Sequence, residues 1–185
     1  MFEAEIKIKI DDPARIANHL MELGFCKKHR VRETDRYFDN AKELIRTTGR
    51  SLRVRLTTDL ETEISSATLN LKGAKADKLT MSREENEINV SSGEDCCRLL
   101  SDLGFSAVPP IVEKIRTTLT LSDMTACLDE VNGLGSFLEL EILTEDSSKR
   151  EEAVRRMEVL LKDLGYSLEN FLQTSYMSLL AGTRE

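Results

Sequence analysis

The chain has 185 residues, of which 40% are hydrophobic and 32% are charged, and its formal net charge is −7. This length suits one domain with an appended helical part, and the acidic balance argues against a general nucleic-acid-binding surface, which would be basic. We expect neither a signal peptide nor a membrane span, and the four cysteines follow no disulfide or zinc spacing, which predicts reduced thiols in a cytoplasmic protein.

The first predicted element is a strand over residues 2–10. Apolar and charged residues alternate strictly in this segment. Because side chains on a strand alternate between its two faces, one face is apolar and the other carries Glu3, Glu5 and Lys7.

The remaining elements are predicted from strand alternation, helical spacing and capping residues. A helix begins at an Asp-Asp-Pro sequence after the first strand and ends near Gly24. Further strands are predicted over residues 31–38, 51–57, 67–72, 82–90, 112–121, 125–130 and 137–143, and further helices over 94–103, 147–164 and 170–180.

The sequence also contains a faint internal repeat. Residues 5–25 and 87–105 share the order strand, acidic helix start, helix and Leu-Gly-Phe, and eighty residues separate the two Leu-Gly-Phe motifs. Two related halves of about four strands each would form a closed antiparallel barrel of about eight strands, with flanking helices, in the α+β class. Leu-Gly-Phe is also a common helix ending, so chance similarity is the alternative.

Charged residues recur at positions i and i+2 on the polar faces of most predicted strands. An exposed sheet surface gains little from such density, because exposed ion pairs contribute about 0–1 kcal/mol. Turned inward, the same faces would make a charged tunnel, in which Arg and Lys suit a polyphosphate and carboxylates suit a hard divalent cation. The alternative is a structural barrel with a solvated charged face. The candidate inward-facing set is Glu3, Glu5, Lys7, Arg53, Arg55, Lys72, Arg83, Glu85, Glu87, Lys114, Arg116, Asp129, Glu139 and Glu141.

These residues carry a family resemblance. Glu3-x-Glu5-x-Lys7 resembles the Glu-x-Glu-x-Lys signature of the CYTH superfamily, the triphosphate tunnel metalloenzymes. The resemblance covers nearly the whole chain and includes the class IV adenylyl cyclase branch. The other motifs occur in the expected order: Arg53-x-Arg55, Leu71-Lys72-Gly73, Arg83-x-Glu85, Glu113-Lys114-x-Arg116, Asp129, Gly133-Leu134-Gly135, Glu139-x-Glu141 and Ser175-Tyr176-x-x-Leu179-Leu180.

The resemblance implies a fold, a ligand and residue roles. The fold would be one CYTH-like domain over residues 1–185, an eight-stranded barrel around a triphosphate, with C-terminal helices over about 147–181 packed on it. Lys7, Arg53, Arg55, Lys72, Arg83, Lys114 and Arg116 would contact phosphates, and Glu3, Glu5, Asp129, Glu139 and Glu141 would hold Mg²⁺ or Mn²⁺. Glu5, Lys7 and Glu141 are the expected catalytic residues, and Glu85 and Glu87 could join either set.

The expected activity is metal-dependent conversion of ATP to cyclic AMP and pyrophosphate by a monomer or homodimer. One alternative is a triphosphatase acting on tripolyphosphate or on a nucleoside or thiamine triphosphate. Another is a non-catalytic nucleotide- or polyphosphate-binding module. The two Glu-x-Glu pairs favour an enzyme, because phosphate binding alone needs fewer carboxylates. The direction in which the triphosphate lies would decide between the two enzymes.

Overall fold

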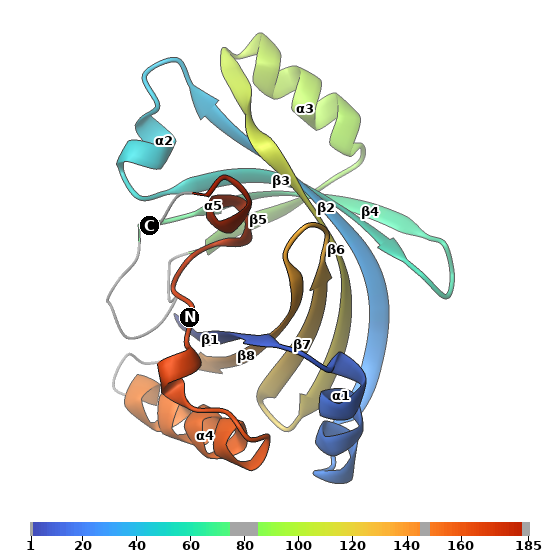
Figure 1. Ribbon diagram of the computed structural model, residues 1–185. Coiled ribbons are helices and arrows are strands. Elements are labelled where there is room, and N and C mark those ends of the chain that lie inside the picture. The colour runs from blue at the N-terminus through green and yellow to red at the C-terminus, as the bar shows by residue number, and fades with distance from the viewer. Residues whose placement is uncertain (1, 75–84, 145–148, 183–185) are drawn as a thin grey trace.

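The computed structural model of the protein describes residues 2–74, 85–144 and 149–182. One eight-stranded antiparallel sheet dominates it, in the order β1-β8-β7-β6-β2-β3-β4-β5 (Figure 1). The strands are β1 (Phe2–Ile10), β2 (Cys26–Asn40), β3 (Ser51–Asp59), β4 (Ser65–Lys72), β5 (Glu85–Val90), β6 (Phe105–Leu121), β7 (Met124–Val131) and β8 (Gly135–Thr144). The helices are α1 (Pro13–Glu22), α2 (Leu44–Thr47), α3 (Gly93–Asp102), α4 (Arg150–Asp163) and α5 (Tyr176–Leu180), with a 3₁₀ turn at Leu168–Asn170.

The sheet curves strongly around a concave interior but does not close (Figure 1). In the described part of the chain, the ladder of β1 pairs only with β8 and that of β5 only with β4. The other edge of β1 is partly covered instead by the C-terminal segment, where Ile8 forms an isolated bridge with Phe171. An α+β fold with eight antiparallel strands is therefore confirmed, whereas the expected closed barrel is not.

The topology supports the internal repeat. α1 and α3 begin eighty residues apart, and the side chains of their N-caps, Asp12 and Ser92, each accept a backbone N–H. Gly24 and Gly104, which follow these helices, have φ angles of +95° and +87°. If each of the strands β1 to β4 changes places with its counterpart among β5 to β8, the strand order is the same as before but is read from the opposite edge of the sheet. The β2–β6 pair lies at the centre of this order. Two related halves account for this symmetry.

Helices α1, α3 and α4 cover the outer face of the sheet and so leave the charged side chains on the inner face. α1 and α4 bury the apolar residues of β1 and β8, and α3 covers β3 and β4. The first of these cores includes Ile6, Ile8, Ile16, Leu20, Leu138, Leu140, Met157 and Leu161, and the second includes Leu52, Val54, Cys96 and Leu100. Strand alternation then directs the intervening charged residues inward.

Several element boundaries differ from the sequence prediction. β2 and β6 are longer than predicted. They continue to pair with each other beyond two register shifts, at Lys27/His29 and Asp35/Tyr37, and these shifts interrupt the alternation of apolar and polar residues from which strands are predicted. The predicted C-terminal helix over 170–180 is reduced to the 3₁₀ turn and the short α5. None of the helices in the described ranges combines the length and the apolar run needed to cross a bilayer.

Candidate functional site

The inner face of the sheet brings together most of the predicted site residues. The side chain of Glu3 and all of Arg83 lie outside the described residues. The other predicted residues are Glu5 and Lys7 on β1, Arg53 and Arg55 on β3, Lys72 on β4, Glu85 and Glu87 on β5, Lys114 and Arg116 on β6, Asp129 on β7, and Glu139 and Glu141 on β8.

Asp129 lies at the centre of the most buried part of this face. The β6–β7 register places Arg116 opposite it. Asp129 Oδ1 accepts a hydrogen bond from Arg116 Nε (2.7 Å), and Oδ2 accepts from Arg116 Nη2 (2.6 Å), Lys114 Nζ (2.8 Å) and the Tyr176 hydroxyl (3.0 Å). A carboxylate with four donors is fully paired, as burial of a charge requires.

The carboxylates of β1 and β8 surround Lys7. The register places Lys7 opposite Glu139 and Glu5 opposite Glu141. Lys7 Nζ lies 3.3 Å from Glu139 Oε1 and 3.8 Å from Glu5 Oε1. Arg116 also pairs with Glu139, and its Nη1 lies 3.9 Å from Glu141 Oε1. Three predicted metal ligands therefore lie against two predicted phosphate-binding cations.

Glu33 and Asp35 on β2 belong to the same network, although the sequence interpretation missed them. Asp35 accepts hydrogen bonds from Arg55 Nε (2.6 Å) and Nη2 (2.8 Å), and lies 3.3 Å from Arg53 Nη1. Glu33 Oε2 lies 3.0 Å from Arg55 Nη1 and 3.3 Å from Lys114 Nζ. The two residues have the same i, i+2 spacing as the other charged pairs, so that signal could have found them.

The network reaches the free edge of the sheet through β4 and β5. Lys72 Nζ lies 3.3 Å from Glu85 Oε2. The amide of Asn70, another residue that the sequence interpretation missed, donates to Glu85 (2.5 Å) and Glu87 (3.2 Å). Among the described residues, the direct contacts that join Glu85 and Glu87 to the site come from the Asn70 amide and, for Glu85, the Lys72 ammonium.

The exposure of the side chains separates two ends of the network. We call Lys7, Lys114, Asp129, Glu139 and Tyr176 the closed end, and Lys72, Glu85 and Glu87 the open end. Side-chain exposure is 0% for Asp129 and 2% for Lys114, but 25% for Lys72 and 31% for Glu85. The open end lies beside the edge of β5 that pairs with no strand among the described residues, and water reaches its charges.

The pKa values of the buried carboxylates reflect their partners. Burial raises the pKa of Glu5, and the neighbouring Glu139 carboxylate raises it further. Burial also opposes ionisation of Glu139, but Arg116 and Lys7 outweigh it and hold the pKa of Glu139 well below its usual range. The site therefore contains one carboxyl that resists ionisation beside another that is held ionised.

The donor chemistry of the site fits a hard divalent cation. Among the described residues, no three His, Cys, Asp or Glu side chains are already grouped to hold a metal, because the inner carboxylates point at Lys and Arg. The Glu139 carboxylate, however, is close enough to Glu5 to destabilise its charge, and a cation between the two carboxylates would relieve this repulsion. Glu5, Glu139 and Glu141 are the candidate ligands, with Asp129 available if its donors move.

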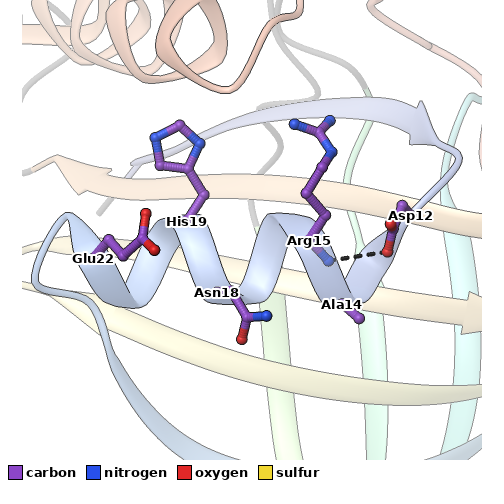
Figure 2. Close-up of a pocket in the computed structure, with 6 residues that line it drawn as sticks. All are labelled: Asp12, Ala14, Arg15, Asn18, His19 and Glu22. Atoms are coloured by element: carbon purple, nitrogen blue, oxygen red, sulfur yellow. Dashed lines mark hydrogen bonds between the residues drawn. The ribbon is translucent and has the colours of Figure 1, made fainter.

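Two surface pockets lie apart from this network. One, of about 450 Å³, runs along α1, where Figure 2 shows Arg15 and His19 projecting from the same side of the helix. The other, of about 810 Å³, lies between α1, the β6–β7 turn and α4, and Phe25 and Met124 contribute to its apolar lining. Neither is lined by a predicted site residue, so the candidate site is the charged inner face.

Comparison with known proteins agrees with this arrangement. The model of the CYTH domain matches residues 1–176. The chain belongs to the CYTH family. A Methanocaldococcus jannaschii member, MJ0240, whose name refers to adenylate cyclase, is 36% identical over 179 residues, which cover 97% of this chain and 98% of the relative.

Two solved structures illustrate the CYTH fold. PH1819 from Pyrococcus horikoshii superposes with a TM-score of 0.87 at 30% identity, covering 97% of this chain and 98% of that one. HpAC1 from Hippeastrum, reported to have a dominant triphosphatase activity, superposes with a TM-score of 0.68 at 19% identity, covering 100% and 98%. The resemblance inferred from the ordered motifs is thus confirmed at the level of family and fold.

Proposed function

We propose that this CYTH protein is a metal-dependent enzyme that acts on a triphosphate and converts ATP to cyclic AMP and pyrophosphate. The observation that carries the proposal is the convergence of cations from four strands on the inner face, each interleaved with carboxylates. These cations are Lys7, Arg53, Arg55, Lys72, Lys114 and Arg116. The name of MJ0240 supports the cyclase reaction.

Triphosphate binding would proceed by exchange of partners. Arg55 and Arg116 each present a planar fork that Asp35 and Asp129 now fill in bidentate fashion. Phosphate oxygens match the same fork geometry. A polyanion entering the inner face could therefore replace carboxylates without leaving any guanidinium unpaired.

The same exchange would release carboxylates for a metal. If phosphates took Lys7 and Arg116, the side chains of Glu5, Glu139 and Glu141 would lose these two cations and, together with Asp129 and Glu3, would be the residues to hold Mg²⁺ or Mn²⁺. The bound ion would lower the pKa of the ribose 3′-hydroxyl and polarise the α-phosphate. We therefore expect triphosphate and metal to bind cooperatively.

The residues of the chain would supply the rest of the catalysis. Glu5 would receive the proton that the 3′-hydroxyl loses, because it would lie beside the ion that acidifies this hydroxyl. Lys7 would stabilise the negative charge that develops on the departing pyrophosphate. Glu141, which is half-buried, would orient the reacting end of the substrate.

A triphosphatase is the second candidate. The side chains gathered on the described inner face are mainly charged or amide groups, which suit phosphate and metal, and lysines already cover the ring of Tyr176. A substrate held by its phosphates alone would satisfy this arrangement. In that reaction, water rather than the ribose hydroxyl would attack phosphorus.

The decisive experiment is incubation with ATP, or with tripolyphosphate, plus Mg²⁺ or Mn²⁺, followed by phosphorus NMR. Cyclic AMP with pyrophosphate would support the cyclase, and phosphate release from tripolyphosphate would support the triphosphatase. Ligand binding without turnover would leave a binding module, and the absence of binding would refute the triphosphate site. Glu141→Gln should abolish turnover, whereas Glu130→Gln, a matched change in an exposed Arg30 ion pair, should not.

A further inference from the structure

The C-terminal segment is built into the site by its attachment to β1. The backbone N–H of Leu172 donates to the carbonyl of Lys7 (2.8 Å), next to the Ile8–Phe171 bridge. Lys7 Nζ in turn donates to the carbonyl of Thr174 (3.4 Å). The segment therefore runs along the free edge of β1 before α5 begins.

Tyr176, the first residue of α5, enters the closed end from this segment. Its hydroxyl donates to Asp129 Oδ2 (3.0 Å). Its ring lies 4.5 Å from Lys7 Nζ and 5.2 Å from Lys114 Nζ, and packs against Phe137 with 5.0 Å between ring centroids. One side chain thus touches a predicted metal carboxylate and two predicted phosphate cations, and it is 7% exposed.

The hydroxyl and the ring of Tyr176 can each hold a neighbouring charged group in place. The hydroxyl donates a hydrogen bond to the Asp129 carboxylate, so it acts as a donor at this position. The ring face attracts ammonium groups through its quadrupole. A lysine ammonium is a point charge on a flexible stem, so a ring that holds two of them restricts where they can point.

We propose that Tyr176 is a positioning residue of the triphosphate site: its ring holds Lys7 and Lys114 for phosphate, and its hydroxyl holds Asp129 for the metal. The inference rests on the proposed function. It adds that the C-terminal segment forms one wall of the site, and it gives the Ser-Tyr motif near the C-terminus a physical role. Because the ring and the hydroxyl act on different partners, two substitutions separate them.

The test compares Tyr176→Leu with Tyr176→Phe. Tyr176→Leu removes both cation–π contacts and should weaken tripolyphosphate binding, measured by calorimetry without added metal, by about tenfold, the equivalent of two such contacts. Tyr176→Phe keeps the ring and should bind tripolyphosphate within about twofold of the unmodified protein. It should instead raise the Mn²⁺ concentration for half-maximal thermal stabilisation by about tenfold, because Asp129, once Lys114 and Arg116 turn to phosphate, loses the hydrogen bond from Tyr176 that still orients its carboxylate.

Tyr166→Phe is the matched control, since Tyr166 packs against the core beneath α1 and α4 and should change neither quantity. A merely structural role would lower the melting temperature of the Tyr176 variants but leave both ligand measurements unchanged, which would overturn the inference. If Tyr176→Leu does not fold, Tyr176→Phe alone decides through its Mn²⁺ dependence. Failure of the unmodified protein to bind tripolyphosphate would refute the proposed function itself. Normal binding by both the unmodified protein and the Tyr176 variants would refute only the role of Tyr176.

Discussion

The closed and open ends of the inner face carry the same kinds of residue but hold them differently. At the closed end, Asp129 takes four donors and is inaccessible to water. At the open end, Lys72 and Glu85 form an ion pair beside the edge of β5 that no other strand pairs with in the described part of the chain. A fully desolvated charge must be paired, whereas a pair reached by water contributes about 0–1 kcal/mol. The charges of the closed end are therefore fully paired before ligand arrives and would have to exchange partners on binding, whereas those of the open end are already reached by water.

Replacement of a carboxylate by an amide should affect stability very differently at the two ends. Asp129→Asn leaves Lys114 and Arg116 without their shared anion and should lower the free energy of unfolding by about 3–5 kcal/mol. Glu85→Gln should lower it by about 1 kcal/mol or less. Urea denaturation of both variants measures the difference. Equal losses would mean that the two ends do not differ in the way their exposure indicates.

Ligand should stabilise the protein by filling both ends together. Tripolyphosphate with Mn²⁺, at about 100 times the dissociation constant, should add roughly 2.7 kcal/mol, or on the order of 5–10 °C in melting temperature. Tripolyphosphate alone should give a smaller shift, and pyrophosphate a smaller one again because it reaches fewer cations. Differential scanning fluorimetry provides the measurement. Purely additive shifts from metal and tripolyphosphate would contradict the partner exchange.

Lys72→Ala should separate ligand binding from stability. Its ion pair at the open end contributes little to folding, so the melting temperature should change little. Tripolyphosphate affinity should nevertheless fall by about tenfold, because a charged hydrogen-bond donor is lost. Arg30→Ala breaks an ion pair on the outer surface and is the control. A similar loss of affinity in that variant would remove Lys72 from the site.

The smallest expected effect concerns Glu5. Burial and Glu139 raise its pKa, so the folded state disfavours the ionised form, and this group opposes folding as the pH rises above its ordinary value of 4.5. Glu5→Gln removes that penalty and should raise the melting temperature at pH 7, with the gain fading as the pH falls toward 4.5. Melting curves across this pH range test the sign. A variant that is less stable at pH 7 would show that Lys7 needs the Glu5 charge.

Much of the architecture is determined by local sequence. Strict alternation over residues 2–10 fixes which face of β1 meets the helices, because one face holds only apolar side chains. The eighty-residue repeat likewise predicts equivalent helices, which the caps at Asp12 and Ser92 begin. Charge spacing also identified charged residues of the inner face on other described strands, such as Arg53 and Glu139, but it was not applied to β2, where Glu33 and Asp35 have the same spacing.

Contacts between distant segments were decided only by the tertiary structure. Nothing local to β2 shows that Glu33 bridges Arg55 and Lys114, because that contact depends on the strand order of the sheet. That β1 and β5 do not pair with each other in the described ranges likewise depends on the tertiary structure, because a strand pattern does not specify pairing partners. Tyr176 reaches Asp129, 47 residues away in the chain, because the C-terminal segment follows the edge of β1. The sequence determined which residues face inward, and packing determined which of them meet and which stay dry.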